Sequence, residues 1–251
     1  MNWLALGIKL ARWRGLLCCG AVLALIACSM VPGAPLAGQP WEWLLAEVMA
    51  LLILYAIWDL EGSRLSAREL AVPAVLGAVA AAGRVALAAV PGVQPVTFLV
   101  IASGYVLGAR AGWLVGGCAV LASNFFLGHG PWTPYQMVSW GLAGASAALL
   151  ARLRPAVSPW LLAGFCFIWG YLYGWIMNLW FWLNFVAVHN WPSFLGAYAA
   201  SFWLDTLHAL GNAFFCLTCG RATLGILQRA RRRLTVQRLE EVGQHSPPQR
   251  Q

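Results

Sequence analysis

Long apolar stretches separated by short polar turns run through almost the whole chain. A membrane-spanning helix needs about 17 to 25 predominantly apolar residues, and the sequence offers about eight such segments. The alternating pattern of a membrane β-barrel is absent, and an isolated strand would leave its backbone unpaired in lipid. The sequence therefore predicts an all-α, polytopic membrane helix bundle with about eight transmembrane helices. We place the spans at 15–32, 43–58, 70–90, 95–109, 111–127, 134–151, 158–184 and 196–219.

Composition and charge support this class and add an orientation. Hydrophobic residues make up 61% of the chain and charged residues 10%, and the mean hydropathy is +0.71. Lys and Arg accumulate in cytoplasmic loops, and with both termini in the cytoplasm every basic residue except Arg84 lies on that side. The net charge of +8 is then a topology signal, and we expect the basic segment from Arg221 onward to contact anionic lipid and no nucleic acid.

The cysteines are interpreted as packing residues, and the N-terminal segment leaves one question open. The seven cysteines lie in or at the ends of apolar helices, where Cys behaves as a small hydrophobe. Cys216 and Cys219 have the spacing of a metal pair, but a second pair or a partnering His is missing, so no metal site is expected. The sequence before Cys28 is similar to a bacterial lipoprotein signal, and whether the chain is cleaved there stays open.

Polar residues inside the spans are costly, and they usually serve a site. Arg84 lies within the span at 70–90, and Asp205 lies at a similar depth in the last span. They are interpreted either as a buried ion pair or as ligand-binding residues, and the two roles are compatible. The topology brings further polar and Trp residues to the outer half of the bundle, where they form an outward-facing pocket or single interhelical hydrogen bonds. The predicted binding residues are Arg84, Gln94, Asn124, His129, Trp132, Gln136, Trp140, Asn178, Trp182, Asp205, His208 and Asn212.

Small residues form two strips. The first consists of Ala74, Ala78, Ala82 and Ala86, and it lets another helix approach closely, either within the chain or in a partner subunit. The second recurs every four residues and predicts tight packing of the short helices at 95–109 and 111–127. It consists of Gly104, Gly108, Gly112 and Gly116.

A series of motifs lies in the middle of the chain: AGR at 82–84, PGVQPVT at 91–97, Gly104, GARAG at 108–112, Gly116, SNFF at 123–126, GHGPWTP at 128–134 and QM at 136–137. Together these motifs resemble the substrate-binding S component of energy-coupling factor (ECF) vitamin transporters, within the branch assigned to cobalamin or precursors such as dimethylbenzimidazole. The resemblance covers 70–225, a six-helix core. It divides the chain into a two-helix extension at 1–69, the core at 70–225 and a basic, largely disordered cytoplasmic tail at 226–251.

The resemblance implies a receptor of the bacterial cytoplasmic (inner) membrane that binds a vitamin-like solute from outside. It implies docking, through the alanine strip, onto a membrane coupling (T) protein associated with two cytoplasmic ATPases. The turn from Pro91 to Gln94 would be a gating loop. This chain would need no cofactor, because its partners hydrolyse ATP.

Two other classes remain as alternatives. A self-sufficient channel or secondary transporter would normally show polar sites at the midplane and an inverted repeat. An intramembrane enzyme could use Asp205 and His208 as a metal pair or an acid–base couple, but the chain carries no third ligand in sequence and no nucleophile elbow, zincin motif, phosphate loop or Rossmann fingerprint. The sequence therefore predicts that the protein is not an enzyme.

Overall fold

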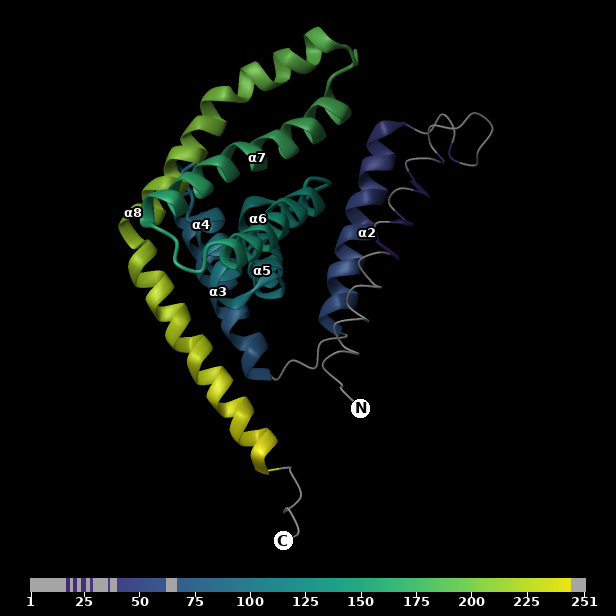
Figure 1. The fold of residues 1–251 in the computed structure, drawn as a ribbon. Helices are drawn as coiled ribbons and strands as arrows, with labels where there is room; N and C mark the ends of the chain where they lie inside the picture. Colours follow the sequence, from purple (N-terminus) through teal and green to yellow (C-terminus); the bar gives the residue numbers. More distant parts are fainter. Residues whose placement is uncertain are drawn as a thin grey trace.

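The computed structural model describes residues 40–61 and 67–244, with isolated positions between 17 and 36. Most of the expected span at 15–32 lies outside the described residues. The part of the chain that is described folds into seven helices without a strand (Figure 1). They are α2 (Trp41–Glu61), α3 (Ala67–Ala86), α4 (Val96–Leu107), α5 (Ala109–Leu127), α6 (Thr133–Leu153), α7 (Pro159–Phe185) and α8 (Trp191–Gln244).

Within these ranges, four helices are long and apolar enough to cross a membrane, so the protein is a helical membrane protein. The spans are Glu69–Ala86, Ala109–Leu127, Pro159–Phe185 and Trp191–Leu234. The predicted count of about eight spans is therefore wrong. The helix α4 has only 12 residues, about 18 Å of a hydrocarbon layer about 30 Å thick. The apolar part of α2 is limited to Ala46–Tyr55, and α6 carries polar residues such as Gln136 along its length.

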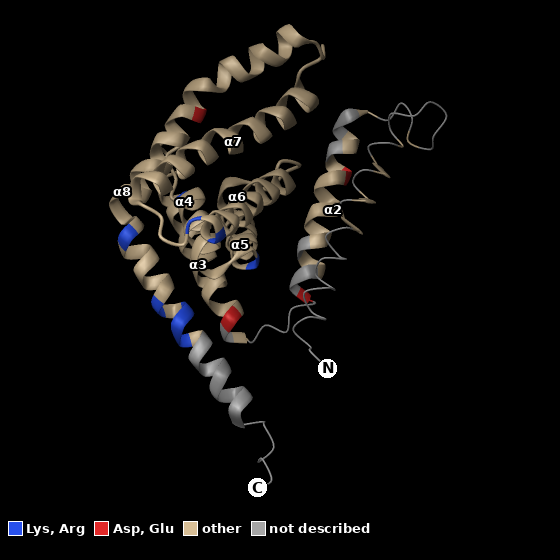
Figure 2. Cartoon of the chain, in the orientation of Figure 1, with Lys and Arg blue, Asp and Glu red and all other residues tan. Residues whose placement is uncertain are grey.

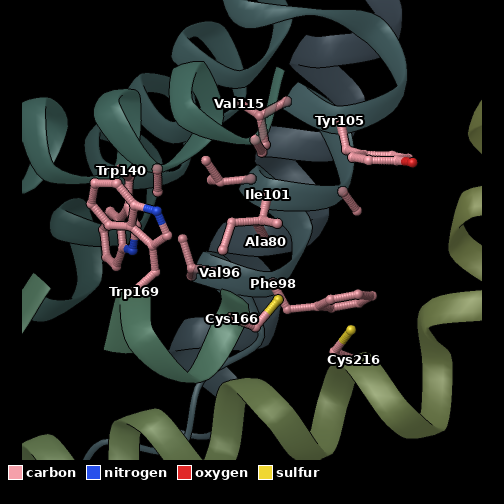
Figure 3. Packing of buried hydrophobic residues seen from close by; sticks show 14 of the residues in the cluster. Ala80, Val96, Phe98, Ile101, Tyr105, Val115, Trp140, Cys166, Trp169 and Cys216 are labelled. Carbon is pink, nitrogen blue, oxygen red and sulfur yellow. The ribbon is translucent and has the colours of Figure 1, made fainter. Parts of the chain in front are cut away.

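The short helix α4 is the centre of the bundle. It packs against α3, α5, α6, α7 and α8, and its residues from Val96 to Val106 are buried except Leu99. Figure 3 shows Phe98 beside Cys166 on α7 and Cys216 on α8, with Ile101 near Val115 of α5. A helix buried on all sides fits the nearly continuous apolar sequence of α4.

Glycines allow α4, α5 and α6 to approach closely. A Cβ atom at Gly112 would lie 2.6 Å from the Cα of Gly144 on α6, and one at Gly104 would clash with the backbone of the same residue. The predicted glycine strip is thus split in the structure. Gly104 and Gly112 meet α6, Gly108 occupies the α4–α5 turn with φ of 98°, and Gly116 faces Trp140.

The alanine strip of α3 faces outward. Ala74, Ala78, Ala82 and Ala86 are exposed, whereas the neighbouring Gly77, Ala80 and Ala81 are buried. The buried side packs against α5, where a Cβ atom at Gly77 would lie 2.5 Å from the Cβ of Cys118. The helix therefore uses one small-residue face for the fold and leaves the other uncovered by the described residues.

The two ends of the chain complete the fold. The extension contributes α2, whose Met49 packs with Tyr135, Val138 and Trp180 of α6 and α7.

At the other end, α8 bends near its middle and continues to Gln244 (Figure 1), where a largely disordered tail from 226 was expected. The sequence from 226 to 242 contains neither Gly nor Pro and consists mainly of good helix formers. Figure 2 shows basic residues along the C-terminal half of α8 and an acidic residue in its N-terminal half.

Candidate functional site

The guanidinium of Arg84 is the centre of a buried polar cluster. Arg84 is 8% exposed and donates from Nε to Gln94 Oε1 at 3.1 Å. Its Nη1 donates to Ser123 Oγ and Asn124 Oδ1, each at 2.6 Å, and its Cζ lies 5.3 Å from the centre of a Trp140 ring. All of these partners are neutral. In an apolar interior a guanidinium is costly unless it is paired, so hydrogen bonds and the aromatic ring are its only compensation among the described residues.

Amide side chains extend the cluster from α5 to α7. Asn124 Nδ2 donates to Thr133 Oγ1 at 3.1 Å and to Gln136 Oε1 at 2.9 Å. Gln136 Nε2 then donates to the hydroxyl of Tyr173 at 3.3 Å. The Asn124 amide group thus both accepts from Arg84 and donates to α6, which fixes its orientation.

A directional chain of hydrogen bonds joins α6, α4 and α8. Trp140 Nε1 donates to Thr97 Oγ1 at 2.9 Å, Thr97 Oγ1 lies 3.0 Å from His208 Nε2, and His208 Nδ1 lies 2.7 Å from the carbonyl oxygen of Gly92. Because a carbonyl only accepts, Nδ1 carries the proton. Nε2 of the neutral ring then accepts from the Thr97 hydroxyl. Every polar group of this chain is satisfied when His208 is neutral.

The chain also anchors the turn between α3 and α4. Gly92 has φ of 76°, and a Cβ atom there would lie 3.0 Å from the backbone nitrogen of His208 and from the carbonyl oxygen of Leu204. Gln94 ties the other end of the turn to Arg84. Only glycine fits both the backbone conformation and this contact, so the turn lies directly on α8.

Asp205 belongs to a second, separate cluster. Its Oδ2 accepts from Asn178 Nδ2 at 2.9 Å and from Ser201 Oγ at 3.0 Å, and the carboxylate lies against the backbone of Gly174. The buried ion pair between Asp205 and Arg84 that the sequence allowed is not formed. Asp205 faces α7, where Asn178 and Gly174 lie.

The other predicted residues lie outside the main cluster. Trp132 packs edge-on against Trp180 at 5.9 Å, and Trp182 Nε1 donates to Ser193 Oγ at 2.9 Å. His129 is exposed. Asn212 is fully buried, and neither its Oδ1 nor its Nδ2 has a hydrogen-bond partner. Of the twelve predicted residues, the main cluster therefore unites Arg84, Gln94, Asn124, Gln136, Trp140 and His208.

Four members of the cluster were not among the predicted binding residues: Thr97, Ser123, Thr133 and Tyr173. Their hydroxyl groups are single polar atoms inside apolar helices, a weak signal in sequence. Tyr173 stacks on Trp140 with ring centres 4.7 Å apart. It is four residues after the buried Trp169 and seven before the buried Trp180, so the helical period of buried aromatic residues could have drawn attention to it.

Comparison with protein-family models, curated proteins and solved structures gives no match. The resemblance to ECF S components therefore depends on the sequence motifs quoted for it.

Proposed function

We propose that this chain is the membrane-embedded substrate-binding subunit of an ATP-driven ECF-type importer. It captures a vitamin-like small molecule, cobalamin or a precursor, from outside the cell. One observation carries the proposal: each of the six helices from α3 to α8 contributes a side chain to a single polar cluster. The contributors are Arg84, Thr97, Asn124, Gln136, Tyr173 and His208.

The position of the cluster supports a binding role. It is built from the region 70–225 that carries the resemblance, and it includes a cation, three amides and three aromatic or imidazole rings. Residues of this kind, gathered in an otherwise apolar bundle, orient a small molecule by hydrogen bonds and stacking. Polar side chains also hydrogen-bond between membrane helices to stabilise their packing, but here a single connected set is shared by all six helices from α3 to α8.

The turn from Pro91 to Gln94 acts as the gate in this proposal. It is held by two hydrogen bonds to the cluster, Gly92 to His208 and Gln94 to Arg84. A solute that binds His208 in place of Gly92, or Arg84 in place of Gln94, releases the turn. Binding and gating therefore use the same side chains.

The exposed strip of Ala74, Ala78, Ala82 and Ala86 is the docking face for the coupling (T) protein, which works with two cytoplasmic ATPases. Small side chains let two helix backbones approach closely in lipid. The chain resides in the bacterial cytoplasmic (inner) membrane with both termini inside, as the distribution of Lys and Arg favours.

The direct test is uptake of labelled cobalamin, cobinamide and dimethylbenzimidazole into proteoliposomes. Four preparations are compared: this chain alone, the coupling protein with both ATPases, all four proteins with ATP, and all four with ADP. Uptake of one compound only by the complete set with ATP supports the proposal. Uptake by this chain alone would identify a self-sufficient transporter, and the absence of uptake by the complete set would refute the corrinoid-type importer.

A further inference from the structure

The described residues contain no carboxylate that neutralises the charge of Arg84. Its contacts are with Gln94, Ser123, Asn124 and the Trp140 ring, and no carboxylate among the described residues forms an ion pair with it. Asp205, the acidic residue of the last span, is engaged with Asn178 and Ser201 instead. A buried guanidinium that keeps its full charge in a membrane protein is favourable to any anion that can reach it.

Two donors of the cluster remain unused. Arg84 makes hydrogen bonds through Nε and Nη1, and its Nη2 has no acceptor among the described residues. The Tyr173 hydroxyl accepts from Gln136, and its own hydrogen has no acceptor in the described part of the chain. Both side chains lie against Trp140: Arg84 Cζ is 5.3 Å from the centre of a Trp140 ring, and the Tyr173 ring stacks on Trp140 with ring centres 4.7 Å apart.

Each of the surrounding side-chain oxygens already accepts one hydrogen bond. The side-chain oxygens of Gln94 and Ser123 accept from Arg84, and that of Asn124 does the same, while the oxygen of Gln136 accepts from Asn124. The cluster therefore has surplus donors and a surplus positive charge. A neutral ligand that offers donors would leave both unmatched, whereas an anionic oxygen group would match both.

From these contacts we infer that the solute carries an anionic oxygen group, a carboxylate or a phosphate, which binds Arg84 Nη2 and the Tyr173 hydroxyl. Trp140 lies against both side chains and positions them. This inference depends on the proposed function for the view that the ligand is a transported solute. It narrows the substrate class to anionic compounds. A neutral compound such as dimethylbenzimidazole on its own is therefore not the expected substrate.

The test uses this chain alone, purified in the neutral detergent dodecyl maltoside, and follows saturable thermal stabilisation. The probes are benzoate, its uncharged counterpart benzamide, inorganic phosphate and the anionic lipid dioleoylphosphatidylglycerol. The variants are Arg84→Gln, Arg84→Lys and Tyr173→Phe, with Arg152→Gln as the control that removes a charge from an exposed position on α6. Size-exclusion profiles verify that each variant is folded, and Arg84→Lys with Tyr173→Phe keeps the test decisive when Arg84→Gln does not fold.

We expect benzoate or phosphate to stabilise the native chain and benzamide to have no effect. Loss of a charge-assisted hydrogen bond weakens binding by about 10- to 100-fold, so Arg84→Gln should lower the affinity for the anion at least tenfold. Tyr173→Phe should lower it by a smaller factor, Arg84→Lys should retain part of it, and Arg152→Gln should match the native chain.

The following binding results overturn the inference. Equal binding of benzoate and benzamide, binding that is insensitive to Arg84 and Tyr173, or no binding of any anion would show that the cluster is not an anion site. If only the lipid gives saturable binding, and this binding is lost in Arg84→Gln, the site binds a lipid headgroup. That result would overturn the inference that the ligand is a solute. ATP-dependent uptake of a neutral compound would refute the anionic substrate and leave the importer intact, whereas anion binding without uptake would refute the importer and leave the site intact.

Discussion

The hydrogen-bond chain through Thr97 makes the sharpest prediction about stability. Thr97→Val keeps the shape of the side chain and removes the hydroxyl that accepts from Trp140 Nε1 and donates to His208 Nε2. Thr97 and Trp140 are fully buried, and His208 is 5% exposed, so water cannot replace the lost partner. Each polar group left unpaired in an interior costs about 1 to 3 kcal/mol, and with two such groups we expect a loss of about 2 to 6 kcal/mol in the free energy of unfolding.

The assay is reversible unfolding in mixed detergent micelles, followed by tryptophan fluorescence. Thr218→Val is the matched control, because Thr218 is exposed on α8 and bonds only within its own helix and to Cys219. Thr97→Ser should recover most of the loss, since it restores the hydroxyl. If Thr97→Val and Thr218→Val reduce stability equally, the chain from Trp140 to Gly92 does not hold the helices together and the argument fails.

Two further predictions follow from the small residues. Gly112→Ala should destabilise the bundle by about 1 to 3 kcal/mol, because the new methyl group would lie 2.6 Å from the Cα of Gly144. The control Gly164→Ala should be neutral or slightly stabilising, because nothing lies within 4 Å of the added methyl group. The same unfolding assay compares the two variants, and equal effects would contradict the close approach of α5 and α6. Ala78→Leu and Ala82→Leu enlarge exposed positions of α3, so folding and solute binding should be unchanged while co-purification with the coupling protein is lost; retained co-purification would place the docking face elsewhere.

The sequence predicted the helical elements of the core well because apolar length and turn residues are local signals. The expected segments at 111–127 and 158–184 differ from α5 and α7 by two residues or fewer at each end. The length of α8 was underestimated, because an apolar pattern ends where a helix leaves the hydrocarbon layer, while helix propensity continues to Gln244. The count of spans failed for a related reason: α4 is apolar because protein surrounds it, and hydropathy does not distinguish a protein interior from lipid.

The sequence identified many residues of the candidate site, but it did not show which of them contact one another. Arg84, Asn124 and His208 could be singled out because polar groups within apolar helices are rare. Depth along a helix follows from position in the sequence, but the direction that a residue faces in the bundle depends on how helices pack. Asp205 therefore looked like a partner of Arg84, and the structure directs it to Asn178 on α7. Tyr173 was missed because an aromatic residue on a buried helix face looks like core.

The helix α3 carries both functional surfaces of the proposal, and this has a thermodynamic consequence. Arg84 is buried in the cluster, whereas Ala82 and Ala86, two residues to either side of it, are exposed. A solute on one face and a coupling protein on the other therefore contact the same rigid element. If solute binding changes the position of α3, it changes the affinity for the coupling protein, and linkage requires the coupling protein to change the affinity for the solute by the same factor. Titrating each ligand with and without the other measures both factors. Two equal factors different from one would establish α3 as a shared element, and factors of one would show that the two faces act independently.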